Sequence, residues 1–125
     1  MNRPRIAGAD LLLRGLASGD ESTLRSVLVL ASAGTSARSV AGTRALPPAT
    51  ARLIHVAALL AVGGSTTSLR CAVELALRAG AQGEEIVEVL ATVAPTVGSA
   101  RVVAAAPRLA QAIGYDIDVE GWDGY

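Results

Sequence analysis

The sequence predicts an all-α protein, folded as a compact bundle of about six helices. Apolar residues recur at helical spacing in several segments. Glycine, proline and small polar residues separate these segments, and no stretch alternates apolar and polar residues as a half-buried strand would. The 125 residues are the size of one ordinary domain. We therefore predict a single domain over residues 1–125, made of N-terminal helices and a loop (1–45), a helical core (46–113) and an acidic, aromatic-containing tail (114–125).

The N-terminal part is predicted to contain two helices. The first covers Ala9–Leu16 and ends at Ser18-Gly19-Asp20, which also offers a cap to the next helix. The second covers Glu21–Ala33 and ends at Gly34, because glycine tolerates the positive φ that closes many helices. The small and polar residues Thr35–Ala45 then form the longest predicted loop.

Four further helices are predicted in the core. Pro47-Pro48 opens one that runs to about Val62, since proline is tolerated in the first helical turn. The others run from Ser65–Ser68 to Ala79, from Gln82–Glu85 to about Pro95, and from about Val97 to Ile113, where Gly114 ends the helix. Pro107 is expected to kink the last of these.

Composition predicts an aliphatic core and self-association. Apolar residues make up 51% of the chain and charged residues only 18%, which excludes disorder for most of it. There is no Phe, and the last eleven residues hold Tyr115, Trp122 and Tyr125, so the rest must pack with aliphatic side chains and glycine. So few charges cannot comfortably cover a monomer, so we expect a homo-oligomer.

Charge and residue types exclude several classes of function. Eleven arginines balance eleven acids, without a basic block, so nucleic acid is not an expected partner. The absence of Lys excludes lysine Schiff-base chemistry, and one Cys with one His cannot form an internal disulfide or a typical zinc site. No cofactor or metal is expected. No apolar run suits a signal peptide or a membrane span, so we expect a cytoplasmic protein.

Arg52 and His55 interrupt a helix that is otherwise apolar nearly all round, a pattern typical of a buried helix. The two are three residues apart and so share a helix face. A buried charge is costly unless it is paired. Two interpretations stay open: Arg52 bonds a carboxylate at an interface while His55 is a satisfied core histidine, or both side chains face a ligand.

The following helix separates into two faces. Arg70, Glu74 and Arg78 form a charged face with two expected i,i+4 ion pairs, and Cys71 falls at its boundary with the apolar face. There a cysteine acts either as a small hydrophobe or as a nucleophile. The third polar cluster, Glu84, Glu85 and Glu88, is interpreted as a solvated helix start, where the helix dipole favours acids.

Three segments resemble the carboxymuconolactone decarboxylase-like family, within the alkylhydroperoxidase D-like superfamily. They are Ala-Thr-Ala-Arg-Leu-Ile at 49–54, Ala-Leu-Arg-Ala-Gly-Ala-Gln-Gly-Glu-Glu-Ile at 76–86, and Val-Ala-Pro-Thr-Val-Gly at 93–98. The likeness covers Leu46–Ile113. It implies a compact helical bundle and a homo-oligomer, often a trimer or hexamer.

The resemblance also implies that the family's peroxidase residues are missing here. Alkylhydroperoxidase D proteins use a Cys-x-x-Cys pair, a following His and an upstream Glu. In the register of Ala-Leu-Arg-Ala-Gly, those positions hold Gly64 and Thr67, Cys71, and Arg52. The decarboxylase branch lacks the cysteine pair but keeps the His, so Cys71 departs from that branch too.

The leading functional hypothesis is therefore a cofactor-free enzyme of the lyase or isomerase type, acting on a small organic acid or lactone by proton transfer. Arg52 would bind a carboxylate or enolate oxygen, because its planar fork matches that geometry. His55 would act as acid and base, since histidine titrates near neutral pH. Cys71 would line the pocket or assist. The alternatives are a catalytically silent oligomeric scaffold or small-molecule-binding protein, and a thiol peroxidase that uses Cys71 alone.

Overall fold

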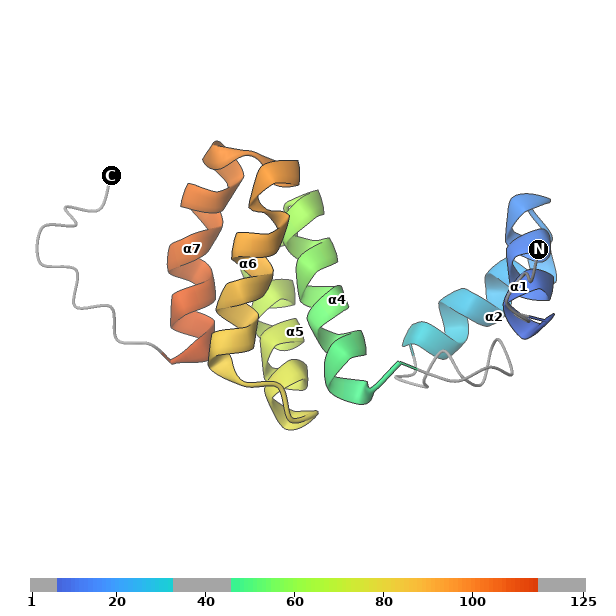
Figure 1. The fold of residues 1–125 in the computed structure, drawn as a ribbon, viewed down its shortest axis with the longest axis horizontal. Coiled ribbons are helices and arrows are strands. Elements are labelled where there is room, and N and C mark those ends of the chain that lie inside the picture. The colour runs from blue at the N-terminus through green and yellow to red at the C-terminus, as the bar shows by residue number, and fades with distance from the viewer. Residues whose placement is uncertain (1–6, 33–45, 115–125) are drawn as a thin grey trace, which may run out of the picture. The chain divides into compact units, whose positions relative to one another are not determined.

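The computed structural model describes residues 7–32 and 46–114, and every regular element in these two stretches is an α-helix. The helices are α1 (Ala7–Ala17), α2 (Glu21–Ser32), α4 (Pro48–Val62), α5 (Thr66–Arg78), α6 (Gly83–Val97) and α7 (Ser99–Ile113) (Figure 1). The predicted all-α class and the helix positions are confirmed. The predicted loop at 35–45 and the aromatic tail lie outside the described residues.

The contacts divide the chain into two units, residues 1–47 and 48–125. The first contains α1 and α2, which pack against each other, and the second contains α4 to α7. The assignment of residues 1–125 to one domain stays a prediction.

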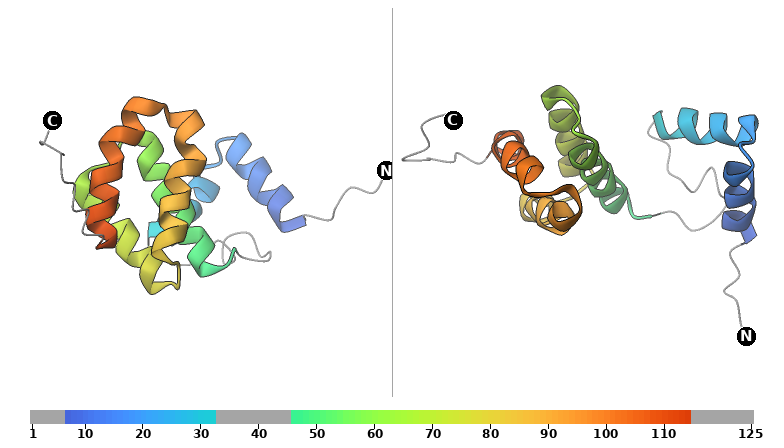
Figure 2. Two further views of the ribbon diagram at one scale, coloured as in Figure 1. Left: turned by 60° about the vertical axis from the view of Figure 1, so that its left-hand side comes forward. Right: turned by 90° about the horizontal axis from the view of Figure 1, so that it is seen from above.

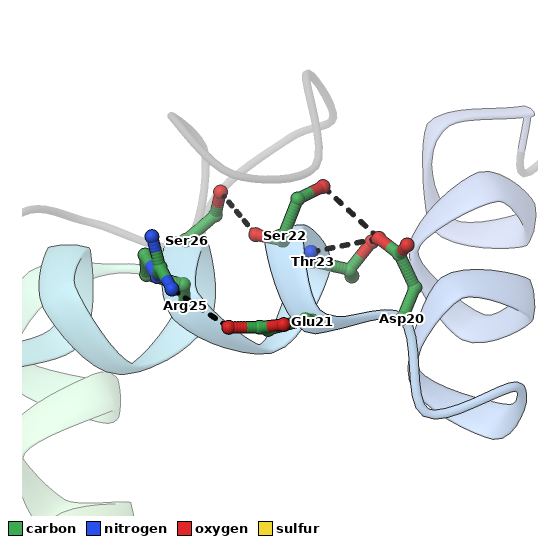
Figure 3. Close-up of polar contacts among 6 residues, drawn as sticks. All are labelled: Asp20, Glu21, Ser22, Thr23, Arg25 and Ser26. Carbon is green, nitrogen blue, oxygen red and sulfur yellow. Dashed lines mark hydrogen bonds and ion pairs between the residues drawn. The ribbon is translucent and has the colours of Figure 1, made fainter.

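In the first unit, Asp20 caps the start of α2 (Figure 3). Its Oδ2 accepts hydrogen bonds from the Thr23 hydroxyl at 2.6 Å, the Thr23 backbone N–H at 2.9 Å and the Ser22 hydroxyl at 3.0 Å. These bonds favour the charged form, so the Thr23 hydroxyl first, and then the Thr23 N–H and Ser22, lower the pKa of Asp20. The turn that connects α1 to this cap includes Gly19, whose φ is +70°, a value that glycine adopts without strain.

In the second unit, α4 to α7 surround one aliphatic core (Figure 2). Helices α4 and α7 each pack on both α5 and α6 and touch one another little, so they lie diagonally across the bundle. The largest fully buried side chains are Leu69, Ile86, Leu109, Val56 and Val73. No polar or charged side chain is buried among the described residues, which agrees with a core built only from apolar groups.

The turns of this unit show why its helices end where they do. Ser65 accepts a hydrogen bond from the Ser68 backbone N–H at 3.1 Å and so caps α5. Gly80 and Gly114 follow α5 and α7 with φ of +102° and +84°, which side chains with a Cβ rarely adopt. Pro95 does not end α6 at once, because the helix continues to Val97.

Ion pairs make no contribution among the described residues of this unit. The two ion pairs expected of Glu74 with Arg70 and Arg78 are wrong, because the described residues form ion pairs only within α1 (Asp10–Arg14) and α2 (Glu21–Arg25). All three side chains of the α5 set are exposed. An exposed pair gains so little that the side chains can stay solvated and apart.

In the described part of the chain, no helix is long and apolar enough to span a bilayer.

Candidate functional site

Helix α4 carries Arg52 and His55, and the structure buries only one of its faces. Val56 and Leu60 are buried there, and Ala49, Leu53 and Leu59 pack beside them. The opposite side, which we call the outer face of α4, is exposed; it consists of Ala51, Ile54, His55, Ala58 and Val62. Ile54 and Val62 keep 51% and 74% of their surface exposed.

The prediction of a helix buried on all sides is therefore wrong for α4. It packs on α5 and α6, and neighbours on these two sides cannot cover its whole circumference. His55 consequently faces solvent and is not a core histidine. Apolar character all round a helix does not say which face its own chain will cover.

Arg52 lies at the border between the buried and outer faces of α4 and is half-buried. Neither Arg52 nor His55 takes part in a hydrogen bond or ion pair with the described residues, which include no carboxylate within 4 Å of either. The residues are adjacent on the helix surface, because i,i+3 side chains are neighbours. A half-buried arginine that has no acceptor among the described residues is available to an anion.

Cys71 lies on α5, turned away from the core that Leu69, Ala72, Val73 and Ala76 form. Its thiol is free and exposed, so the expected position at the edge of the apolar face is wrong. One helix position is 100° of rotation, and Cys71 lies two positions from Leu69 and two from Val73, which places it opposite both. No hydrogen bond joins Cys71 to Arg52 or His55.

The polar cluster at the start of α6 is solvated, as expected. Glu84, Glu85 and Glu88 are all exposed. The Gln82 backbone N–H donates to Glu85 Oε1 at 2.9 Å, which satisfies a donor at the helix start. A hollow of about 220 Å³ opens next to this cap, lined by Gln82, Gly83, Glu84, Ile113 and Gly114. None of the three candidate site residues borders it.

Two arginines that the sequence analysis did not single out connect α7 to the end of α4 and to the turn that follows it. Arg101 on α7 donates from Nη1 to the Ala61 carbonyl oxygen at 2.6 Å, and Arg108 donates to the Gly64 carbonyl oxygen at 3.3 Å. The last turn of α4 has no basic residue of its own, so Arg101 satisfies a carbonyl there and suits the negative end of the helix dipole. Arg101 and Arg108 are seven residues apart and so lie on one face of α7, and this spacing was the feature of the sequence that could have identified them.

A single-cysteine chain cannot run an internal dithiol cycle, and we expect no peroxide reduction with a dithiol electron donor above background. The motivation is that Cys71 is the one cysteine of the sequence. The measurement is peroxide consumption by the wild type and by Cys71→Ser. Turnover that survives Cys71→Ser and disappears on unfolding would contradict this account of the lost redox residues.

The comparisons with known proteins agree with the fold. The model of the carboxymuconolactone decarboxylase family matches residues 29–111, well over half of the chain. No curated protein and no solved structure shows significant similarity. The match includes α4, α5 and α6 entirely and most of α7, and with them Arg52, His55 and Cys71. The helical architecture and this match together show that the chain belongs to the carboxymuconolactone decarboxylase family.

Proposed function

We propose that the protein is a cofactor-free enzyme that acts by proton transfer on a small organic acid or lactone, in a cytoplasmic setting. The observation that carries the proposal is Arg52, a half-buried side chain that pairs with no carboxylate of the described residues, next to the exposed His55. Family membership supports a reaction of the decarboxylase or isomerase type.

In the proposed reaction, Arg52 holds a carboxylate or enolate oxygen of the ligand. The neutral imidazole of His55 accepts a proton from the carbon next to the ligand's carbonyl, and the electron pair of that C–H bond moves into the enolate. The guanidinium donates hydrogen bonds to the developing oxyanion, which lowers its energy. The imidazolium then returns the proton at another carbon, which completes an isomerisation. In a decarboxylation, the C–C electron pair forms the enolate as CO2 leaves, and His55, which must enter this reaction as the imidazolium, gives its proton to the carbon and becomes neutral.

His55→Gln separates catalysis from folding. Glutamine keeps some hydrogen bonding but cannot take up a proton at neutral pH, so turnover should disappear while helicity and melting temperature stay unchanged. The experiment screens small organic acids and lactones for turnover and follows the His55 ring resonances by NMR during ligand addition. Turnover retained in His55→Gln would exclude His55 as acid and base.

The second candidate is a catalytically silent scaffold or small-molecule-binding protein. The exposure of His55 and Cys71 favours it, because the described residues enclose neither side chain in a water-excluding pocket. Ligand binding that moves the His55 resonances without any turnover would favour this candidate. A single-cysteine peroxidase is the weaker alternative: the Cys71 thiolate would attack a peroxide oxygen, leave a sulfenic acid and an alcohol, and need an external thiol for reduction.

We expect the protein to self-associate, as a trimer or hexamer. Exposed apolar side chains occur on α1, α4 and α7, including Leu11 at 72% and Val103 at 67% exposure. Burying such surface stabilises an assembly by about 25 cal/mol per Å². A second copy would also exclude water from the outer face of α4. Sedimentation at micromolar concentration should show a trimer or a larger species. A clean monomer would contradict the self-association and the idea that a second copy covers this face.

A further inference from the structure

Three arginines gather where α4 ends and α5 begins. Arg101 on α7 donates to the Ala61 carbonyl oxygen at 2.6 Å, and Arg108, also on α7, donates to the Thr66 hydroxyl at 3.4 Å. Arg70 is exposed and lies one turn beyond Thr66, so the two share a face of α5. We call Arg70, Arg101 and Arg108 the arginine corner.

The positive charge of the arginine corner has no local counterpart. Helices α4 and α7 contain no acid, and neither does the turn at 63–65. Glu74, the one acid of α5, forms no ion pair with a described residue. A guanidinium has five N–H donors, yet Arg101 and Arg108 each engage the described residues through one nitrogen atom. The corner therefore has both charge and donors left for the carboxylates of another molecule.

The start of α6 has the complementary chemistry. Glu84, Val87 and Glu88 are exposed and lie on one face of the helix, because they are three and four residues apart. Neither carboxylate forms an ion pair with a described residue. The hollow of about 220 Å³ that Glu84 helps to line opens beside them and has room for an incoming side chain. We call Glu84, Val87 and Glu88 the acidic patch.

The arginine corner and the acidic patch of one chain are too far apart to pair. Helix α4 ends at one end of the bundle and α6 begins at the other (Figure 1). Helix α5 connects these ends and has 13 residues, a length of about 20 Å. The Debye length at physiological ionic strength is about 8 Å, so the two surfaces hardly attract each other within the chain. Another molecule must supply each counterpart, and a second copy of this chain carries both.

We propose that the arginine corner of one copy binds the acidic patch of a second copy. Val62, the exposed residue that follows Ala61, adds an apolar contact for Val87. Complementary charges set the register of such a contact and speed association. A contact between two different patches, repeated from copy to copy, closes into a ring when the rotation allows, which suits the trimer proposed above. The contact rests on that self-association and gives it a surface.

Charge reversal tests the contact in the full-length protein by sedimentation. Arg70→Glu with Arg101→Glu should sediment mainly as a monomer at micromolar concentration, and so should Glu84→Arg with Glu88→Arg, because like charges then meet. The chain with all four substitutions should assemble again, since opposite charges face each other with the signs exchanged. The matched control is Arg78→Glu, which reverses an exposed arginine at the other end of α5 and should leave the assembly intact.

Circular dichroism reports whether each variant folds. If Arg101→Glu impairs folding, Arg70→Glu alone keeps the test, because Arg70 bonds to no described residue; it should raise the Kd of assembly roughly tenfold or more. Assembly that ignores both reversals would overturn the proposal, as would a four-substitution chain that folds and stays monomeric.

The wild type separates this contact from the proposals on which it rests. A wild-type monomer would remove the self-association and this contact together, whereas a wild-type trimer that tolerates the reversals would remove this contact alone. Turnover and small-carboxylate binding are measured separately and concern only the proposed enzyme.

Discussion

Arg52→Ala is expected to weaken the binding of small carboxylates such as succinate while the assembly and the melting temperature stay unchanged. The Arg52 side chain is half-buried and pairs with no carboxylate of the described residues, so its loss removes a ligand contact and leaves none of those residues without a partner. Hydrogen bonds to charged groups contribute about 1.5–3 kcal/mol, so binding should fall roughly ten- to a hundredfold. Calorimetric titration and thermal unfolding of both proteins measure the two effects.

The matched control is Arg78→Ala, which removes an exposed arginine from α5 and changes the net charge by the same amount as Arg52→Ala. It should leave carboxylate affinity within experimental error. If Arg52→Ala instead lowers the melting temperature or breaks the assembly while affinity is unchanged, Arg52 pairs with an acid of another subunit. That result would favour the scaffold over the enzyme.

Leu109→Ala is expected to destabilise the second unit strongly. Leu109 is 2% exposed and belongs to the single buried cluster that α4 to α7 share. Removing a buried leucine side chain costs about 2–5 kcal/mol through lost burial and the cavity that remains. The buried cluster contains no aromatic side chain, so only aliphatic neighbours could move toward the space. For a domain of this size the melting temperature should fall by roughly 10 °C or more.

Val103→Ala is the control on the same helix. Val103 is 67% exposed in the single chain, so its truncation should change the free energy of unfolding by less than about 0.5 kcal/mol. Thermal unfolding followed by helical circular dichroism compares the two variants. A similar loss in both would show that the outward side of α7 is covered in the assembly, while no loss in Leu109→Ala would contradict the core described above.

Local sequence determined the helices and their ends. Proline opens α4, Ser65 caps α5, Glu85 caps α6, and Gly80 and Gly114 follow helices with positive φ. Each of these signals acts within a few residues, through one backbone hydrogen bond or one φ angle, and is readable without knowledge of the neighbours. The family resemblance between Leu46 and Ile113 was readable for a similar reason, because it rests on a helix end and a helix start at a short, fixed spacing.

Only the tertiary structure decided which faces are covered. The apolar sequence of α4 left a core position and a ligand-facing position open for His55. Packing on α5 and α6 covers one face of the helix and leaves His55 exposed. Cys71 is exposed because the core lies on the other side of α5. The hydrogen bond from Arg101 to Ala61 joins residues 40 positions apart, which no local pattern reveals. Helical periodicity sets the angle between side chains on one helix, but the direction in which that helix faces depends on the positions of the others.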